Sequence, residues 1–523
     1  MADLMARTIS VERKRDGAGR NAPASKADPA RARKTAGKPV KKSTKSAAKP
    51  AGKSTKGGRS SIRTFRQALE FLNAQVNYER RPPLNRARAR GVFTLARAKR
   101  LLADLGNPQK SFKSVHIGGT KGKGSTATML AAMLQNNALK VGLYTSPHIL
   151  DVRERISIDG DMISENAFAK AIGQIADIVS GYKSDHPSYF EILTAAAFLY
   201  FRDKKVDVAV IEVGLGGRFD ATNLIRPEVC GITSISMDHM AILGDKIEEI
   251  AEEKAGIFKD NVPVVSAPQP REVKQVLRKA AEKTHSPIFF AGNEPGDEIE
   301  FSYRFESSRS AGPQARICIS TESSHFDHLA VPMVGEHQAI NCGVAIGILD
   351  QLKNRGFKID DELAVAGLAR VHLPGRMELV CEEPRVLVDA AHNAASIEAL
   401  MRAIGQNVSS ETMVVIFGCC SDKDVVGMLR QLQLGADKVI FTRINSPRSA
   451  DPVELSARFA EVSGNSRMAQ VSGSLEEALE IAQKAITRED LICITGSFYL
   501  VSEAKAFFAT HPHRVQSTST GAI

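Results

Sequence analysis

From about residue 61 onward, the chain alternates between short apolar runs and longer segments in which apolar positions recur every three or four residues. Short apolar runs bounded by glycine, proline or polar clusters are typical of buried strands, and the longer spacing is typical of helices. The pattern predicts helices at 64–75, 96–105, 127–136 and 192–201, and strands at 115–117, 141–144, 206–213 and 229–236. Because strands alternate with helices, we expect a parallel sheet covered on both faces.

The pattern changes in the second half of the chain. Segments 288–290 and 298–305 are interpreted as antiparallel strands, and helices follow at 337–353 and 360–369. After Leu373-Pro374-Gly375 the alternation restarts, with strands at 385–388, 413–417, 438–442 and 490–495 and helices at 396–404, 425–432, 452–462 and 475–486. We therefore expect two α/β domains without an internal repeat, a larger one at 61–373 and a smaller, Rossmann-like one at 374–512.

The excess of basic residues is concentrated at the start of the chain, ahead of these domains. Of its 523 residues, 1–60 hold 17 Lys and Arg but 4 Asp and Glu, whereas the remainder holds 53 basic and 55 acidic residues. The net charge of +11 therefore belongs to the first 60 residues, which are too polar to bury a core. We expect 1–60 to be a disordered basic tail and 513–523 a flexible one. A solvated extension is favoured over a tether for nucleic acid.

The composition narrows the class of protein further. The seven cysteines form no C-x-x-C pair, which favours buried free thiols in a reducing compartment. The chain has no apolar run of about 18 residues and no secretory signal at its start. The sequence therefore predicts a cytoplasmic protein, expected to be a monomer, with no membrane partner.

A glycine-rich loop joins the strand predicted at 115–117 to the helix that follows it. Its sequence, Gly-Thr-Lys-Gly-Lys-Gly-Ser at 119–125, would let backbone N–H groups approach a phosphate at a helix N-terminus. Lys123 would then meet the outer phosphates, and Ser125 would supply a hydroxyl. This loop differs from the regular P-loop pattern because an additional residue, Gly124, stands between Lys123 and Ser125. The alternative is an ordinary glycine turn before a helix.

Polar side chains lie near or just after the carboxyl ends of several predicted strands. Glu212 precedes a Gly-Leu-Gly-Gly turn, Ser146 follows the strand at 141–144, and Asp238-His239 follow the strand at 229–236. Ligands of open α/β sheets bind at the carboxyl ends of strands, and a phosphate site needs Mg²⁺, which takes oxygen ligands. The alternatives are a salt-bridged Glu212, a plain Ser-Pro turn and a structural His239.

Three further residues are candidates with ordinary alternatives. Lys254 lies in a charged helical segment that would normally face solvent. Asp389 and His392 follow the strand at 385–388, where a helix cap provided by Asp389 or Asn393 is the alternative.

Together the motifs resemble the Mur ligase superfamily and, more closely, the folylpolyglutamate synthase/dihydrofolate synthase family. The resemblance runs in order from about residue 64 to 508. Its motifs include Gly-Thr-Lys-Gly-Lys-Gly-Ser (119–125), Thr-Ser-Pro-His (145–148), Glu-Arg-Ile-Ser-Ile-Asp-Gly (154–160), Glu-Val-Gly-Leu-Gly-Gly-Arg-Phe-Asp-Ala-Thr-Asn (212–223), Pro-Gly-Arg-Met-Glu (374–378) and Asp-Ala-Ala-His-Asn (389–393). The string at 212–223 is the most specific of these.

The resemblance implies a P-loop-containing parallel-sheet ATPase domain, like the Mur ligase central domain, followed by the smaller domain. It implies an enzyme that uses ATP and Mg²⁺ to add L-glutamate to dihydropteroate and to folates through an acyl phosphate. The residues that match the family's sites are, for ATP, Gly122, Lys123, Gly124, Ser125, Asn341, Arg376, Asp389 and His392, and for the metal, Ser146, Glu212 and His239. Lys123, His239 and Lys254 match catalytic positions, and Lys254 matches the lysine that the family carboxylates with carbon dioxide. The expected substrate contacts are Phe93, Thr94, Leu95, Ser188, Tyr189, Phe190, Glu191, Phe219, Asp220 and Ala221.

The chain departs from the family pattern at two positions. Lys121 stands where the family usually has Asn, and Ala390 where it usually has Gly, which would be strained if that position needed a positive φ. Three other functions stay open: a folylpolyglutamate synthase alone, a Mur-type UDP-muramyl peptide ligase, and a nucleotide-dependent nucleic-acid-binding protein. The near-neutral body argues against the last.

Overall fold

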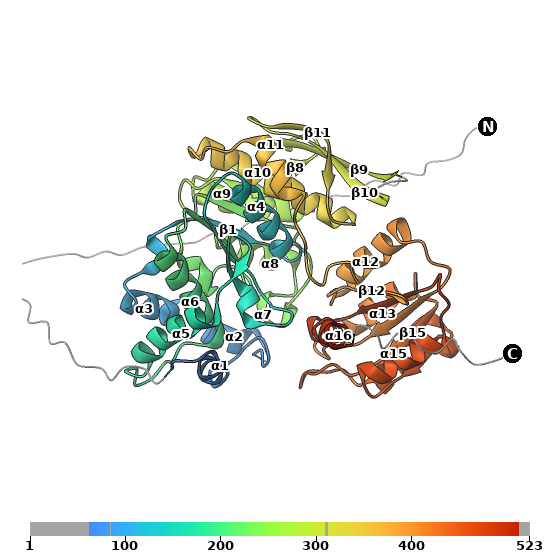
Figure 1. The fold of residues 1–523 in the computed structure, drawn as a ribbon. Coiled ribbons are helices and arrows are strands. Elements are labelled where there is room, and N and C mark those ends of the chain that lie inside the picture. The colour runs from blue at the N-terminus through green and yellow to red at the C-terminus, as the bar shows by residue number, and fades with distance from the viewer. Residues whose placement is uncertain (1–61, 84, 309–311, 512–523) are drawn as a thin grey trace, which may run out of the picture. The chain divides into compact units, whose positions relative to one another are not determined.

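Two sheets organise the part of the chain that this computed structural model describes, which is residues 62–83, 85–308 and 312–511 (Figure 1). The described residues belong to one unit, Gly57–Ile523. The architecture is a two-domain α/β fold in which a smaller domain follows a larger one, as predicted. The tails predicted at 1–60 and 513–523 lie outside the described residues.

The larger sheet has 11 strands in the order β11-β10-β9-β8-β7-β6-β1-β5-β2-β3-β4. The neighbouring strands from β9 to β2 in this order run parallel to one another. Antiparallel strands extend the sheet at both ends. The strands are β1 (Lys113–Gly118), β2 (Val141–Tyr144), β3 (Ile156–Ile158), β4 (Asp161–Met162), β5 (Val208–Glu212), β6 (Val229–Ile232), β7 (Val264–Ser266), β8 (Ile288–Gly292), β9 (Ile299–Ser308), β10 (Gly312–Ser320) and β11 (His325–Val331).

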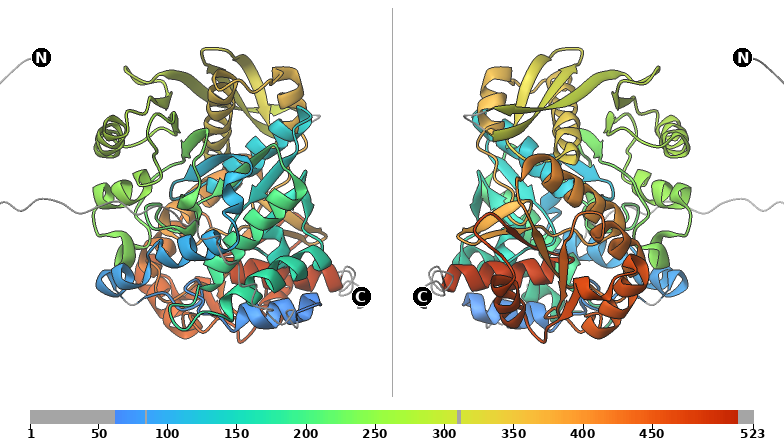
Figure 2. Two further views of the ribbon diagram at one scale, coloured as in Figure 1. Left: turned by 90° about the vertical axis from the view of Figure 1, so that its left-hand side faces the viewer. Right: turned by 90° about the vertical axis from the view of Figure 1, so that its right-hand side faces the viewer.

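Helices cover both faces of this sheet, because alternate side chains of its central strands point to opposite sides. Val208 and Val210 of β5 pack with α4, α10 and α11, whereas Ala209 and Ile211 pack with α1, α3, α5 and α6. Helices α8 and α9 pack with Ile232 of β6 and Val264 of β7. The β9–β10 hairpin lies beside α10 (Figures 1 and 2).

The helices of this domain begin and end as follows: α1 (Phe65–Asn73), α2 (Arg86–Val92), α3 (Ala96–Asp104), α4 (Lys123–Asn136), α5 (Glu165–Val179), α6 (Tyr189–Lys204), α7 (Met240–Leu243), α8 (Ile247–Ala255), α9 (Arg271–Lys283), α10 (Glu336–Asn354) and α11 (Asp361–Leu368).

The smaller sheet has six strands in the order β12-β13-β17-β14-β15-β16, and all but the antiparallel edge strand β12 run parallel. Helices α12, α13 and α14 cover one face, and α15 and α16 the other. The elements are β12 (Glu378–Glu382), β13 (Arg385–Val388), α12 (Ala394–Asn407), β14 (Met413–Phe417), α13 (Val425–Leu432), β15 (Lys438–Phe441), α14 (Pro452–Ser463), β16 (Ala469–Val471), α15 (Leu475–Lys484), β17 (Leu491–Thr495) and α16 (Phe498–Thr510).

Two predictions about individual elements need correction. Segment 288–290 is not antiparallel: β8 pairs in parallel with β7 and with β9, and the antiparallel pairing begins between β9 and β10. The helix predicted at 127–136 already begins at Lys123, because the last part of the glycine-rich loop is the first turn of α4. That shift places the lysine and Ser125 on the helix rather than before it.

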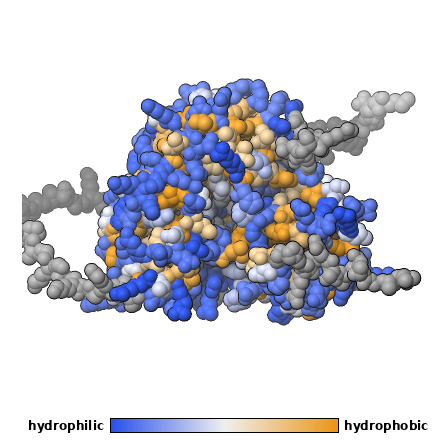
Figure 3. All heavy atoms as spheres, viewed as in Figure 1, coloured by the Kyte–Doolittle hydropathy of each residue, from blue (hydrophilic) through white to orange (hydrophobic). Residues whose placement is uncertain are grey.

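The surface and the cysteines agree with the compositional expectations. Hydrophilic side chains cover much of the face drawn in Figure 3, with smaller apolar areas between them. None of the helices in the described ranges is long and apolar enough to cross a membrane. All seven cysteines are free, five of them buried; Cys318 in β10 and Cys381 in β12 are partly exposed.

Candidate active site

The loop between β1 and α4 has a backbone that glycine alone tolerates at two positions. Gly119 and Gly122 have φ values of +134° and +85°. A Cβ atom on Gly122 would lie 1.9 Å from Oδ1 of Asn341, a residue of α10 that is 3% exposed. The close approach brings two predicted ATP-site residues, Gly122 and Asn341, into contact.

This loop is also fixed to the end of β6. The backbone N–H groups of Thr120 and Lys121 both donate to the carbonyl oxygen of Ser234, at 2.9 and 3.3 Å. Lys123 Nζ turns back to donate to the Thr120 carbonyl at 3.4 Å, and Ser125 is buried in the first turn of α4. The loop therefore presents a helix N-terminus with a lysine beside it, which is an arrangement suited to a phosphate.

Glu212 lies at the carboxyl end of β5, next to the loop 119–125, here called the phosphate loop. It pairs in register with Ile117, is 4% exposed, and its Oε2 would lie 3.3 Å from a Cβ on Gly124. The backbone N–H of Ser146 donates to Oε2 at 2.8 Å. Burial raises the pKa of Glu212, although Lys123 and the Ser146 amide act in the opposite direction. The structure thus joins two of the three predicted metal ligands directly.

His239, the third predicted ligand, lies on the loop after β6, at the same edge of the sheet as the phosphate loop. Its side chain is 42% exposed and its φ is +52°. Among the described residues no three or more His, Cys, Asp or Glu side chains form a group that could hold a metal. The predicted set has only two residues of these types, with a serine as the third.

Lys254 is a buried lysine, so the alternative of a solvated charged face is wrong. It lies in the last turn of α8, is 4% exposed, and its Nζ donates to the carbonyl oxygen of Gly119 at 2.7 Å. Burial lowers the pKa of Lys254 to about 7, and the nearby cations Lys123 and Lys121 act in the same direction. A lysine with this pKa is partly neutral near pH 7 and can act as a nucleophile.

Lys121 connects the phosphate loop to the smaller domain. Its Nζ lies 3.1 Å from Oδ2 of Asp238 and 3.2 Å from Nε2 of His392. His392 Nδ1 donates to the Ala390 carbonyl at 2.8 Å, so Nε2 is free to accept from the lysine. Burial, followed by Lys121, lowers the pKa of His392 well below 6.5, and the imidazole is therefore neutral.

The other predicted residues of the smaller domain hold its first loop together. Asp389 accepts hydrogen bonds from the backbone N–H groups of Met377 and Ala391, at 3.0 and 2.8 Å. The cap of α12 is Asn393, whose side chain accepts from Ser396 N at 2.9 Å. Arg376 stacks on Phe498, with 4.9 Å between the guanidinium and the ring centroid.

The departure at Ala390 carries no backbone strain. Ala390 is not among the residues with positive φ. Its β carbon therefore does not incur the steric cost of a left-handed backbone conformation.

The predicted substrate residues fall into two groups. Ser188 and Glu191 form the capping box of α6, and Arg97 Nε donates to Glu191 at 3.1 Å. Tyr189 is buried next to them, Phe190 packs against Gly214, and Phe93 contacts Tyr78 edge-on ahead of Thr94 and Leu95. In the second group, Phe219 is 47% exposed, whereas Asp220 is buried, holds the Leu215 and Thr222 amides, and precedes the buried Ala221.

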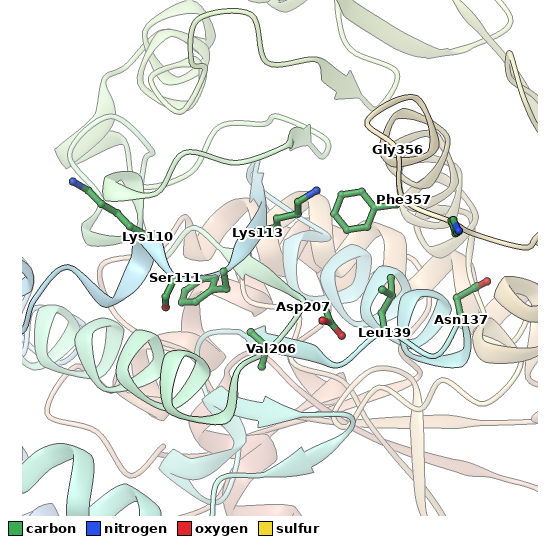
Figure 4. A pocket seen from close by; sticks show the side chains of 11 residues that line it. Lys110, Ser111, Lys113, Asn137, Leu139, Val206, Asp207, Gly356 and Phe357 are labelled. Atoms are coloured by element: carbon green, nitrogen blue, oxygen red, sulfur yellow. The ribbon is translucent and has the colours of Figure 1, made fainter.

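A cavity of about 800 Å³ lies away from all of these residues (Figure 4). It is lined by Lys113 at the start of β1, by Asp207 before β5 and by Phe357 after α10, over whose ring the Lys113 ammonium lies at 4.6 Å. These residues belong to the amino ends of the strands, whereas the phosphate loop follows their carboxyl ends. The cavity therefore contains none of the predicted site residues.

Sequence reasoning missed the contacts that Asp238 makes with the smaller domain. Lys423 of the smaller domain donates to Oδ1 of Asp238 at 3.1 Å, and Asn393 Nδ2 donates to Oδ2 at 3.2 Å. Asp238 precedes the predicted ligand His239 and could have been considered with it. Nothing in the spacing of Lys423 indicated a partner 185 residues away.

Comparison with known proteins gives a consistent result over both domains. Residues 117–349 match the Mur ligase middle domain, and residues 375–498 match the Mur ligase, glutamate ligase domain. A dihydrofolate synthase/folylpolyglutamate synthase of Bacillus subtilis is 36% identical over 416 residues, which cover 79% of this chain and 94% of that protein.

Two solved structures show the same similarity in three dimensions. The Mycobacterium tuberculosis folylpolyglutamate synthase complexed with ADP and AMPPCP superimposes with a TM-score of 0.76 at 32% identity, covering 85% of this chain and 98% of that one. E. coli FolC in complex with DHPP and ADP gives a TM-score of 0.73 at 27% identity, covering 86% and 98%.

Proposed function

The chain belongs to the folylpolyglutamate synthase/dihydrofolate synthase family of the Mur ligase superfamily, and we propose that it joins L-glutamate to dihydropteroate and to folates at the expense of ATP. It is an ATP-dependent ligase that forms C–N bonds. ADP, AMPPCP and DHPP are bound in the related structures. The finer assignments below concern this chain's own residues.

We assign the phosphates of ATP to the start of α4. Gly122, Gly124 and Ser125 offer backbone N–H groups at a helix N-terminus, and Lys123 supplies a positive charge beside them. Asn341 lies against Gly122 from α10. Arg376, Asp389 and His392 would contribute from the smaller domain.

Ser146, Glu212 and His239 are the residues that would hold Mg²⁺. The fit rests on Glu212: a carboxylate that is 4% exposed, beside a phosphate loop, is costly unless a cation compensates it. Oxygen ligands from a serine and a carboxylate suit this ion. Bound there, Mg²⁺ would neutralise part of the phosphate charge.

The reaction that these groups support is acyl activation. The substrate carboxylate attacks the γ-phosphorus of ATP, ADP leaves, and an acyl phosphate results. The amine of glutamate then attacks the acyl carbon, phosphate leaves, and an amide forms with loss of the amine's proton. The protein's part is to align the reactants and to neutralise developing charge, chiefly through Lys123 and the α4 N-terminus.

Lys254 is assigned a carboxylated side chain. Its neutral amine would attack CO₂ and lose a proton, which converts a cation into an anion at Gly119, next to the phosphates. The burial of Lys254 and its pKa of about 7 support this assignment, because the neutral amine is the reactive form.

The pteridine side of the substrate is assigned to Phe93, Thr94, Leu95, Ser188, Tyr189, Phe190, Glu191, Phe219, Asp220 and Ala221. Phe219 has the most exposed of the aromatic rings named here and is free to stack on a flat ligand. We also place the enzyme in the cytoplasm, in keeping with its free thiols, and expect it to be a monomer.

The observation that carries the proposal is the contact of Glu212 with Ser146 beside Gly124 of the phosphate loop. The test is glutamate-dependent ADP release with dihydropteroate, tetrahydrofolate and a UDP-muramyl substrate, with the products identified by mass. Turnover of both pteridine substrates is expected. Turnover of tetrahydrofolate alone would restrict the chain to folylpolyglutamate synthesis, and turnover of the UDP-muramyl substrate alone would refute the proposal.

A further inference from the structure

The loop 145–151, here called the serine loop, lies between Glu212 and the smaller domain. At one end, the Ser146 amide donates to Glu212 at 2.8 Å. Further along, Ile149 is 9% exposed and belongs to the same hydrophobic cluster as Leu500 and Val501 of α16. A β carbon on Gly375, where the smaller domain begins, would come within 2.8 Å of Ile149 Cδ1. One short loop therefore contacts both the candidate metal site and the second domain.

Glu154 holds the backbone of this loop in place. Its Oε2 accepts from Ile149 N at 2.7 Å, and its Oε1 accepts from Leu150 N and Asp151 N at 2.8 Å each. A carboxylate that accepts three backbone N–H groups fixes the loop firmly, because charged acceptors make the stronger hydrogen bonds.

Arg155 holds the same loop from its other side. Its backbone carbonyl accepts from Thr145 N at 3.1 Å, and its Nε donates to His148 Nδ1 at 2.8 Å. The guanidinium is 1% exposed and makes a two-pronged ion pair with Glu79, with both N–O distances 2.7 Å. Since a buried guanidinium needs its counter-ion, Glu79 determines where Arg155, and hence His148, can lie.

Arg448 of the smaller domain reaches the same group of residues. Its NH1 donates to the backbone carbonyl of Glu79 at 2.8 Å, while Nε and NH2 are held by Asp422 at 2.9 and 2.6 Å. The smaller domain thus contacts the serine loop twice: directly at Ile149, and through Arg448, Glu79 and Arg155 at His148.

We propose that the serine loop couples the docking of the smaller domain to the metal site, with Ile149, Glu79, Arg155 and Arg448 as residues that position Ser146 against Glu212. When the smaller domain is displaced, both contacts are lost and the Ser146 end of the loop is held less firmly. The assignment of Ser146 and Glu212 as metal ligands rests on the proposed function. The coupling between the smaller domain and the serine loop does not.

The test is hydrogen exchange of the full-length protein with ADP and Mg²⁺ for Arg448→Ala and Ile149→Ala. Each should make the amides of 145–151 exchange roughly ten-fold faster while those of α4 keep their wild-type rates. Mn²⁺ affinity, titrated by electron paramagnetic resonance in the presence of ADP, should fall ~5-fold or more. Arg443→Ala is the matched control, because Arg443 also pairs with an aspartate of the smaller domain, at 2.9 Å, but its side chain is 61% exposed.

Wild-type exchange of 145–151 in both variants, or faster exchange throughout the larger domain, would overturn the coupling. So would equal effects of Arg443→Ala and Arg448→Ala. Because exchange is measured without turnover, a failure of the coupling is distinguished from a failure of the proposed ligase reaction.

Discussion

Lys121 and Asp238 form an ion pair, with 3.1 Å between Nζ and Oδ2, and Lys423 of the smaller domain binds the other oxygen of the same carboxylate at 3.1 Å. Burial alone would raise the pKa of Asp238, but Lys121, His239 and Lys423 lower it well below its ordinary value. The carboxylate therefore stays ionised and links the phosphate loop to the second domain. Lys121, one of the two positions at which the sequence is expected to depart from the family pattern, is part of the link.

Replacing Lys121 by the family's usual residue tests this link. Lys121→Asn leaves Asp238 with Lys423 but removes one partner of a largely buried pair, so we expect a loss of roughly 1–2 kcal/mol in the free energy of unfolding. Calorimetry without nucleotide measures it. Lys110→Asn, at an exposed lysine, is the control. Equal melting temperatures for the two variants would show that the ion pair contributes nothing.

Gly122→Ala should disable the phosphate loop. The φ of +85° disfavours alanine, and the added carbon would overlap Asn341, so the loop has to move. We expect ATP affinity to fall ~100-fold, about 2.7 kcal/mol, measured by calorimetric titration. Gly405→Ala in α12, where a β carbon meets nothing within 4 Å, should bind ATP normally. Wild-type affinity in Gly122→Ala would remove the loop from the nucleotide site.

Glu212→Gln should keep the fold and abolish ligation. The amide has the same size and can still accept from Ser146, but it lacks the charge that would hold a cation. A fall in kcat of ~10²-fold or more is expected, measured by ADP release at saturating Mg²⁺. Glu252→Gln on the exposed side of α8 is the control. Near-normal turnover of Glu212→Gln would contradict the metal role.

Lys254 should be indispensable as a carboxylated side chain. Lys254→Ala is expected to be nearly inactive and to be partly rescued by short carboxylic acids, which can occupy the vacated space. Activity is measured with and without added formate or acetate. Full activity of the unrescued variant would exclude the carbamate as a requirement.

The same lysine should affect stability in a pH-dependent way when CO₂ is removed. Its pKa is about 7 in the folded chain, against an ordinary value of 10.5, so between these values the unfolded chain binds more protons. The free energy of unfolding therefore rises with pH across this window, as the cost of burying the ammonium disappears. The free energy of unfolding of Lys254→Met should rise less than that of the wild type between pH 7 and 9 in calorimetric scans. Parallel curves would mean that Lys254 titrates normally.

Deleting residues 1–60 should leave the ligase kinetics unchanged. The expectation comes from the composition of this segment and its distance in sequence from every matched motif. The measurement is the KM for each substrate together with the melting temperature. A drop of several degrees, or a raised KM for folate, would contradict it. RNA binding that weakens with salt, seen for the full-length chain and not for the deletion variant, would support a role of residues 1–60 as a tether for nucleic acid.

Much of the fold could be predicted because strands buried on both faces are continuous apolar runs. Val208–Glu212 and Met413–Phe417 are fully buried, and their predicted strands were correct to within two residues at either end. Strand β8 was misassigned, because the apolar run 288–290 carries no information about the direction of its neighbours. Edge strands such as β11 were missed, since half of their side chains face solvent and leave no such run.

The candidate site was predictable where its parts are consecutive in sequence. The phosphate loop and the 212–223 string are continuous, and the structure places them side by side through Gly124 and Glu212. The supporting contacts were not predictable, because each depends on a pair brought together by folding. Glu79 meets Arg155 and Arg448 across 76 and 369 residues, and a surface-type glutamate at position 79 gives no sign of either.

The distribution of thiols has a practical consequence. Burial raises the pKa of Cys230, Cys342 and Cys419 to about 12, and it also raises the pKa of Cys420 and Cys493, so these five thiols are protected from alkylation. The two partly exposed thiols, Cys318 and Cys381, lie one in each domain. These two thiols offer attachment points for a donor and an acceptor dye, so energy transfer between them would report any change in the distance between the two domains without an engineered cysteine.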